Sequence, residues 1–306
     1  MTKLGQDLIR GGREALAIAK GESAPVRVVD SDGNPVPTAR LALLFGVGVV
    51  AILAEIPPME WGSLLMAERF DLPVVSQSYG TIPDSAWKRR KFAESPQSYY
   101  RPDWTESDTL NASIGQGYVI LNPLQLAVMA ARIASGRDLQ PRLLAGNHPQ
   151  PTPLPFNPAS FEAVRAGMDE VVNGAGTAGR SRLPFPDIRM AGKTGTAQVR
   201  NLGADRGRAG AAWRYRDHGL FVFFAPVGAP RYAGAVVIEH GLGGSRAAAP
   251  VAKDVLTYLF DKDLAMQALL PLEQQWGGTM AERFARRSEA WAALAPGETL
   301  PNPAAS

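Results

Sequence analysis

The stretch Met190–Val199, with the sequence MAGKTGTAQV, constrains the fold more than any other part of the chain. It packs a lysine, two threonines and two glycines into the five residues from Gly192 to Thr196. Glycines let a backbone come close to a ligand. From Thr196 onward polar and apolar residues alternate, which is the period of a half-buried strand. The stretch therefore predicts a strand whose edge offers an ammonium group, hydroxyls and backbone N–H groups to an anionic or carbonyl-bearing ligand.

Gly-Lys-Thr also occurs in the nucleotide-binding loop G-x-x-x-x-G-K-[ST], in which a helix begins at the lysine. Here Asp187 stands where the first glycine is required, and a strand-like run follows Lys193. These two differences disfavour a nucleotide site. Two alternatives remain at this point: the K-T-G motif of the penicillin-recognising serine enzymes, and an ordinary strand end rich in glycine and threonine.

Other motifs in the chain separate these alternatives. Two segments, Asp108–Tyr118 and Asn122–Ala127, resemble the transpeptidase domain of class B penicillin-binding proteins. A further set resembles the penicillin-binding protein 2 branch, the elongation transpeptidase: Phe70–Pro73, Tyr79–Asp84 and Trp87-Lys88. The resemblance covers about residues 65–260, and its motifs occur in the order of the family.

The expected fold class is α+β. The resemblance implies part of a transpeptidase domain of the penicillin-binding and β-lactamase-like type, with an antiparallel sheet flanked by helices. Hydrophobic periodicity and turn residues predict the same kinds of element. One expected helix begins at Pro123 and ends before Gly136. Three others are expected at Ala159–Val172, Ser245–Phe260 and Met280–Ala293, and strands are expected at Gly219–Ala225 and Tyr232–Glu239. Residues 70–103 are expected to be rich in loops, and Asn173–Gly179 to be a flexible loop before the K-T-G strand.

Three regions are expected along the chain. Residues 1–63 do not fit the family pattern and are expected to be poorly ordered, residues 64–265 form the C-terminal part of the transpeptidase domain, and residues 266–306 form a helix with a disordered tail. The uncharged run Leu41–Ile56 is shorter than a membrane-spanning helix and lacks the features of a signal peptide. We expect it either to pack as a surrogate core helix or to leave the chain partly unfolded.

The composition excludes several kinds of site. The net charge is only +3 and the basic and acidic residues are interspersed, so no nucleic-acid partner is expected. The chain has no cysteine, which excludes disulfides and thiolate metal sites. The three histidines, His148, His218 and His240, lack metal-ligand spacing. We therefore expect neither a metal nor a cofactor.

The resemblance implies acyl transfer at the strand that contains Lys193. In the family a serine attacks the penultimate D-Ala carbonyl of a peptidoglycan stem peptide, an amine from a second stem resolves the acyl-enzyme, and β-lactams mimic the donor. By resemblance Lys193 is the catalytic residue, which supplies positive potential for the substrate carboxylate and the proton network. Thr194, Gly195 and Thr196 bind the substrate, and the Thr196 N–H is one donor of the oxyanion hole.

The serine of this reaction lies in an S-x-x-K motif, and a second motif is S-x-N. Ser85 and Lys88 form the one S-x-x-K pair in the chain, and no S-x-N or S-x-D occurs. Ser85 and Lys88 are thus the alternative nucleophile pair, although Ser85 is expected in a loop and Lys88–Lys91 as a solvated charge run. The absence of S-x-N, and of an S-x-x-K pair in the sequence context of the family, suggests the C-terminal part of a transpeptidase joined to a foreign N-terminus, as a truncated or frame-disrupted gene would produce.

The expected function is that of a peptidoglycan D,D-transpeptidase of the penicillin-binding protein 2 type that lacks its nucleophile motif. The alternative is an inactive pseudoenzyme or remnant that acts at most as a binding or interaction module. Expected partners are stem peptides ending in D-Ala-D-Ala, β-lactams and, by family, membrane proteins of the elongation machinery. The family implies the periplasmic face of the inner membrane, although no export signal or membrane anchor is recognised in this chain.

Overall fold

The computed structural model describes residues 70, 72–73, 79–81, 83–93, 102–105, 108, 111, 117–146, 148–199 and 212–294. The chain divides into two compact units between Lys253 and Asp254. The first 63 residues, including the run Leu41–Ile56, lie outside the described part, so the expectations for them and the predicted domain boundaries stay predictions. None of the helices in the described part is long and apolar enough to cross a membrane.

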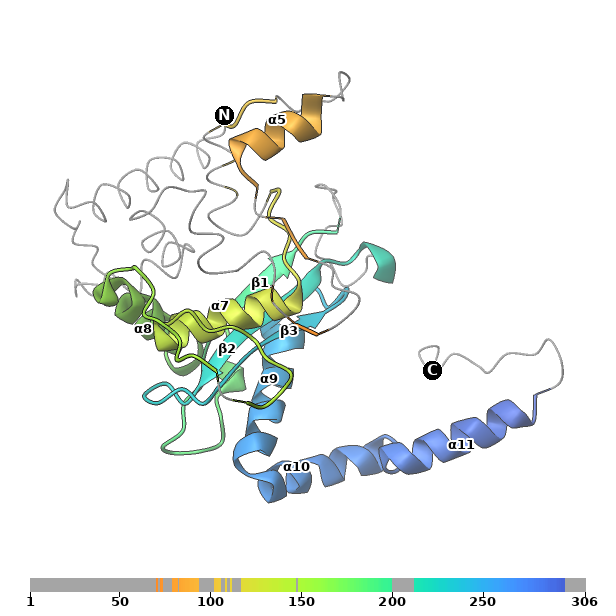
Figure 1. Cartoon of the computed structure of the whole chain (residues 1–306). Coiled ribbons are helices and arrows are strands. Elements are labelled where there is room, and N and C mark those ends of the chain that lie inside the picture. Colours follow the sequence, from red (N-terminus) through yellow and green to blue (C-terminus); the bar gives the residue numbers. More distant parts are fainter. Residues whose placement is uncertain are drawn as a thin grey trace, which may run out of the picture. The chain divides into compact units, whose positions relative to one another are not determined.

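The first unit contains a three-stranded antiparallel sheet (Figure 1). Its strands are β1 (Ala191–Ala197), β2 (His218–Ala225) and β3 (Tyr232–Ile238), in the order β1-β2-β3. The predicted antiparallel pairing of the K-T-G strand with the next strand, and the hairpin that follows, are confirmed. Within this sheet β1 is an edge strand, so one side of its backbone is not paired with another described strand.

Two helices of the first unit begin and end where the sequence signals predict. Helix α7 (Pro123–Ser135) has Pro at its first position, and Asn122 and Gln125 form a reciprocal capping box. Gly136 ends it with a φ of 68°, a left-handed conformation that glycine adopts readily. Helix α8 (Pro158–Asn173) is capped by Asn157. All five apolar positions predicted for α8 are buried: Phe161, Val164, Met168, Val171 and Val172.

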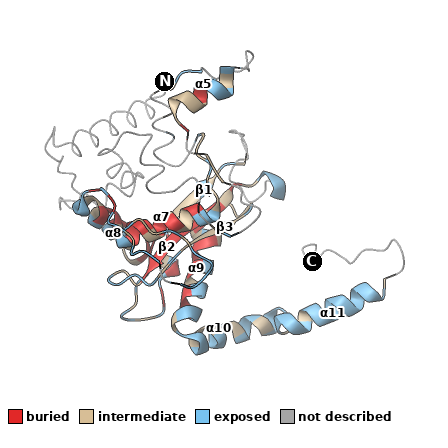
Figure 2. Cartoon of the chain, viewed as in Figure 1, coloured by how far each residue is buried: buried red, intermediate tan, exposed pale blue. Residues whose placement is uncertain are grey.

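Helices α7 and α8 lie on one face of the sheet, with α7 against β2 and β3 and α8 against β1 (Figure 1). The buried side chains between these layers form one hydrophobic core, which Figure 2 shows as the red zone of the helices and sheet. Ala191 and Phe224, which are opposite each other in the β1–β2 register, contribute to this core. The α+β fold class predicted from the resemblance is thereby confirmed.

Aromatic rings occupy the opposite face of the sheet. Phe221 and Phe223 stack with their ring centroids 6.2 Å apart. A Cβ at Gly192 would lie 2.3 Å from Phe221 Cζ, and a Cβ at Gly234 would lie 2.6 Å from Phe223 Cζ. The two glycines therefore make room for the two rings. Helix α9 (Gly244–Phe260) also begins against the sheet, since a Cβ at Gly244 would lie 2.0 Å from the carbonyl oxygen of Leu220.

A helix lies where the sequence predicted a loop. Helix α5 covers Ser85–Ala93, and the Trp87 N–H donates to the carboxylate of Asp84, which caps its first turn. The expected solvation of Lys88–Lys91 is wrong for its first member. Lys88 is only 3% exposed, whereas Arg89, Arg90 and Lys91 are exposed.

The segment Asn173–Gly179 forms the predicted loop before β1, and hydrogen bonds connect both of its ends to neighbouring elements. The Asn173 side chain donates to the carbonyl oxygen of Met190 at 2.9 Å. The Ala178 N–H donates to the carbonyl oxygen of Val171 at 2.9 Å, and Ala178 is buried. A short 3₁₀ helix, η1 (Gly179–Ser181), follows this segment, and a second one, η2 (Trp213–Tyr215), precedes β2.

The second unit contains the end of α9 and two further helices, α10 (Lys262–Gln275) and α11 (Met280–Ala292). Helix α11 matches the predicted arginine-rich helix, and Thr279 and Glu282 form its capping box. Helix α10 was not among the expected helices, and Pro271, a residue that is unfavourable in a helix interior, lies inside it. Several large apolar side chains of this unit are exposed: Met266, Leu270, Trp276, Phe284 and Trp291.

Candidate active site

The candidate site is built on β1, at the edge of the sheet. In the register with β2, Lys193 is opposite Val222, Thr194 opposite Phe221, and Thr196 opposite Gly219. Because side chains alternate along a strand, Lys193 is on the face that contains the core, and Thr194 and Thr196 are on the other face. One edge strand therefore presents an ammonium on one face and two hydroxyls on the other.

The ammonium of Lys193 has no acidic counterpart among the described residues. Its Nζ donates to the carbonyl oxygen of Thr194 at 2.8 Å, and the side chain is half-buried. Burial lowers the pKa of this ammonium below the ordinary lysine value, because a desolvated charge is disfavoured. A half-buried cation without a paired carboxylate is suited to an anionic ligand, which would supply the missing charge.

The hydroxyl of Thr194 contacts a second threonine that the sequence interpretation did not include in the site. Thr177 Oγ1 lies 2.9 Å from Thr194 Oγ1, and Thr177 belongs to the segment between α8 and η1. No local sequence pattern connects these two residues, which are 17 positions apart. The contact depends on the turn after α8, which returns the chain to β1. Thr196, by comparison, is exposed on the strand itself.

The two glycines of the motif have different surroundings. A Cβ at Gly192 would collide with the Phe221 ring, so this glycine is required by packing. Gly195 is more open: a Cβ there would lie 3.3 Å from Leu220 Cβ, which is a tight contact rather than a collision. The backbone of Gly195 is covered on one side by Gly244 at the start of α9. Gly195 thus places no side chain beside Lys193 and Thr194.

Two of the histidines that appear scattered in the sequence lie together at the far end of β1. The rings of His218 and His240 have centroids 4.8 Å apart, and the His240 N–H donates to His218 Nδ1 at 2.9 Å. The hairpin register explains this, because Gly219 is opposite Ile238. Among the described residues no group of three or more His, Asp or Glu side chains could hold a metal ion.

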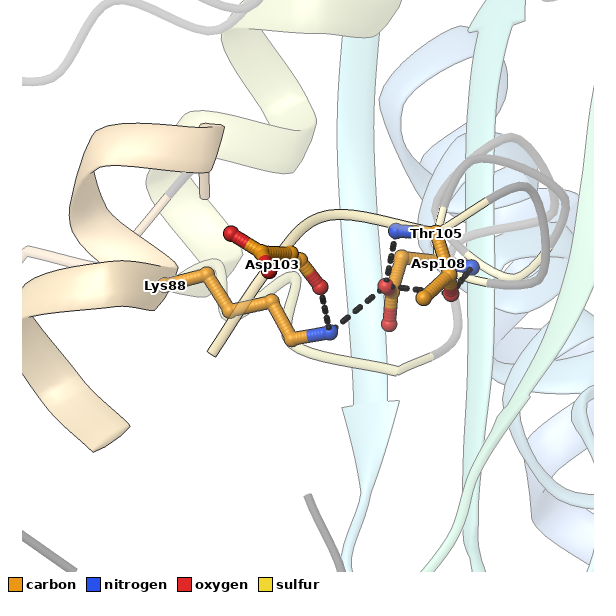
Figure 3. A network of polar contacts seen from close by, with 4 residues as sticks. All are labelled: Lys88, Asp103, Thr105 and Asp108. Atoms are coloured by element: carbon orange, nitrogen blue, oxygen red, sulfur yellow. Dashed lines mark hydrogen bonds and ion pairs between the residues drawn. The ribbon is translucent and has the colours of Figure 1, made fainter. Parts of the chain in front are cut away.

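The alternative pair, Ser85 and Lys88, lies in a different environment. Ser85 is the first residue of α5, and Lys88 is on the next turn. Figure 3 shows that Lys88 Nζ donates to Asp108 Oδ2 at 2.7 Å and to the carbonyl oxygen of Asp103 at 2.8 Å. A lysine that accepts a serine proton must be neutral. Lys88 Nζ already donates to two acceptors other than Ser85, so this geometry does not favour the alternative pair, which stays a prediction.

Asp108 is the centre of the network in Figure 3. Its Oδ2 also accepts the Thr105 N–H at 2.7 Å and the Thr105 hydroxyl at 2.6 Å. Burial raises the pKa of Asp108, but the hydrogen bonds from Lys88 and Thr105 outweigh this effect and hold the pKa below its usual value. The network fixes the chain between α5 and the segment that leads to α7.

A comparison with known families supports the interpretation of β1. The profile described as "Penicillin binding protein transpeptidase domain" matches residues 88–257. The peptidoglycan D,D-transpeptidase MrdA of Haemophilus influenzae is 32% identical over 207 residues, which are 63% of this chain and 31% of that protein. MrdA of Acinetobacter baumannii is 36% identical over 202 residues, 61% of this chain and 28% of that protein. The chain thus spans about a third of the length of these curated relatives.

Solved structures give the same result. The Pseudomonas aeruginosa penicillin-binding protein 2 in complex with WCK 5153 aligns with a TM-score of 0.55 and 29% identity, over 80% of this chain and 56% of that one. The Helicobacter pylori penicillin-binding protein 2 in complex with MreC aligns with a TM-score of 0.59 over 83% of this chain and 49% of that one. The identity to the latter is 23%, so it supports the fold alone.

Proposed function

This chain belongs to the penicillin-binding protein transpeptidase domain family, in its penicillin-binding protein 2 type, and from this premise we propose that β1 binds peptidoglycan stem peptides ending in D-Ala-D-Ala. The observation that carries the proposal is the half-buried Lys193 ammonium, which has no carboxylate partner among the described residues. The terminal carboxylate of a stem peptide is such a partner. β-Lactams, which mimic this donor, are the second expected class of ligand.

Each group on β1 has a part in this binding. Lys193 supplies the positive potential, and the hydroxyls of Thr194 and Thr196 are the donors for the carboxylate and the adjoining amide. The open edge of β1 accepts an extended peptide in the way that an added strand would pair. Gly195 leaves the space over which the ligand backbone lies. In the full reaction the Thr196 N–H would be one donor of the oxyanion hole.

We further propose that the chain binds these ligands without forming an acyl-enzyme. The single S-x-x-K pair in the sequence is Ser85 and Lys88, no S-x-N occurs, and Lys88 is engaged by Asp108. Without a nucleophile that is activated by a neighbouring base, no covalent intermediate forms. The alternative role, a binding or interaction module of the cell-wall elongation machinery at the periplasmic face of the membrane, rests on family membership.

Equilibrium binding of an N-acetylated peptide ending in D-Ala-D-Ala tests the site, with the C-terminal amide of the same peptide as the control. We expect the acid to bind about ten- to a hundredfold more tightly than the amide, because hydrogen bonds to a charged group contribute about 1.5–3 kcal/mol. Lys193→Gln should abolish most of this difference. Equal affinity of the two peptides for the wild-type chain would refute the proposal.

Intact mass after incubation with a penicillin tests the second part of the proposal. We expect no covalent adduct. A stoichiometric adduct on any serine would overturn the non-covalent interpretation, and an adduct on Ser85 would establish the alternative nucleophile pair. The two experiments are independent, because a chain that can be acylated would still distinguish the acid from the amide when no penicillin is present.

A further inference from the structure

The segment between α8 and η1 brings one hydroxyl to the K-T-G strand from outside that strand. Thr177 Oγ1 and Thr194 Oγ1 are 2.9 Å apart, which is hydrogen-bond distance for two hydroxyls. Thr177 is exposed and Thr194 is half-buried, so both are beside the surface on which β1 would receive a ligand. Thr177 has no part in the binding proposed above.

The position of Thr177 is set by its neighbours in the chain. On one side Asn173 is tied to the carbonyl oxygen of Met190, directly before β1, and on the other the Ala178 N–H donates to the carbonyl oxygen of Val171. The Arg182 Nη2 donates to the carbonyl oxygen of Gly174 at 2.9 Å. These bonds anchor the turn to α8 and to the start of β1, so the Thr177 hydroxyl is held in place before any ligand arrives.

Gly176, next to Thr177, allows the backbone of the turn to lie close to the end of α8. A Cβ at Gly176 would lie 2.3 Å from Val171 Cα and 2.6 Å from the carbonyl oxygen of Val171. Real side chains do not come so close, so this position requires glycine. The turn therefore presses directly on the end of α8, and Thr177 is presented by a rigid support.

The direction of the hydroxyl–hydroxyl bond decides what Thr194 can offer a ligand. A hydroxyl has one proton to donate and two lone pairs that accept. If Thr194 donated to Thr177, its single proton would be used. If Thr177 donates to Thr194, the Thr194 proton is available, and a chain of hydrogen bonds that ends on an anion strengthens each of its members.

We propose that Thr177 is a positioning residue: it donates to Thr194 Oγ1, fixes the rotamer of Thr194, and directs the Thr194 proton to the carboxylate of the ligand. This inference rests on the proposed function of β1 and adds a residue from a separate element to the site. The proposed relay from Thr177 through Thr194 is specific for an anionic acceptor. A neutral terminal amide draws much less on the relay than a carboxylate does.

The binding test uses the full chain and the same acid and amide peptides. Thr177→Val keeps the shape of the side chain and removes the hydroxyl, whereas Thr177→Ser keeps the hydroxyl. We expect Thr177→Val to weaken binding of the acid about two- to tenfold, which is the range for loss of one hydrogen bond. Binding of the amide should be unchanged, and Thr177→Ser should stay near the wild type. The matched control is Thr152→Val, at an exposed threonine in the connection before α8.

Three results would overturn the inference: equal weakening of acid and amide by Thr177→Val, no effect on the acid, or Thr177→Ser as weak as Thr177→Val. A wild-type chain that does not prefer the acid would instead remove the proposed function. In that case a ligand-free measurement still decides the positioning role. The χ1 rotamer of Thr194, from three-bond couplings to its methyl group, should be single in the wild type and averaged in Thr177→Val. An unchanged rotamer would refute the role.

Discussion

Replacing Asp108 by Asn should destabilise the chain strongly, because it leaves a buried ammonium without its counter-charge. The Lys88 side chain is 3% exposed, and its Nζ is 2.7 Å from Asp108 Oδ2. After Asp108→Asn the hydrogen-bond acceptor that Lys88 Nζ retains among the described residues is neutral, the carbonyl oxygen of Asp103. Breaking one side of a buried ion pair typically costs about 3–5 kcal/mol. We expect a loss near the lower end, about 3 kcal/mol, because Asp108 itself is 12% exposed and water reaches its side of the pair.

The matched variant is Lys88→Met, which keeps most of the aliphatic stem and removes the charge. It leaves a carboxylate that still accepts the N–H and the hydroxyl of Thr105 and has some contact with water. The expected loss is therefore smaller, about 1–3 kcal/mol, the cost of an unsatisfied hydrogen-bond partner. In the double variant neither charge remains buried, so its loss should be less than the sum of the two single losses by at least about 1 kcal/mol.

Urea unfolding followed by far-UV circular dichroism gives the free energies for all four proteins of this cycle. Tryptophan fluorescence gives a second readout near the network, since Trp87 lies in α5. A loss below about 1 kcal/mol for Asp108→Asn, or strictly additive losses in the double variant, would refute the conclusion that Lys88 and Asp108 form a buried, coupled pair.

Three further results are expected. The folded-state pKa of Asp108 is lowered, so its contribution to stability is complete above the unfolded-state pKa of about 3.9 and is lost as pH falls through the folded-state pKa. The difference in unfolding free energy between the wild type and Asp108→Asn should therefore shrink on acidification. Growth of that difference would contradict this argument. Since the Lys193 pKa is lowered, affinity for the acid peptide should fall as pH rises through that value, below the range of an ordinary lysine, and Lys193→Gln should give a flat profile. Gly192→Ala should cost about 1–3 kcal/mol in urea unfolding through overpacking against Phe221. In a double variant, replacing the ring by Phe221→Leu should relieve part of the cost of Gly192→Ala. Additive losses from the two substitutions would contradict the packing explanation.

The sequence was sufficient for elements whose ends are determined locally. Pro123 at the first position of α7 and Gly136 after its last residue act within one turn, and both were identified correctly. The alternation after Gly195 predicted a strand at β1, and the apolar run Gly219–Ala225 predicted its antiparallel partner β2. For these elements the physical cause lies within a few residues of its effect. The candidate residues from Lys193 to Thr196 came from the K-T-G motif together with the resemblance to the family, and their roles stay predictions.

The features that were missed depend on residues distant in the sequence. Lys88 is indistinguishable from Arg89 in a charge run, and its burial is compensated by Asp108 and by the carbonyl oxygen of Asp103, 20 and 15 positions later. The contact of Thr177 with Thr194 requires the packing of α8 on β1. Helix α10 was also missed; it continues through Pro271, a residue that disfavours a helix interior.

The collision between a side chain at Gly192 and the Phe221 ring also bears on how such a chain evolves. Selection for a folded sheet alone would retain this glycine in a descendant that had abandoned acyl transfer. A smaller residue at 221 would remove only part of this collision, because a Cβ at Gly192 would also lie 2.7 Å from the carbonyl oxygen of Val222, so Gly192 should persist even where position 221 changes. Part of a motif used to recognise enzymes is thus inherited with the architecture. The neighbouring Lys193 is under no such packing constraint, so its persistence in a lineage would record the continued presence of a ligand.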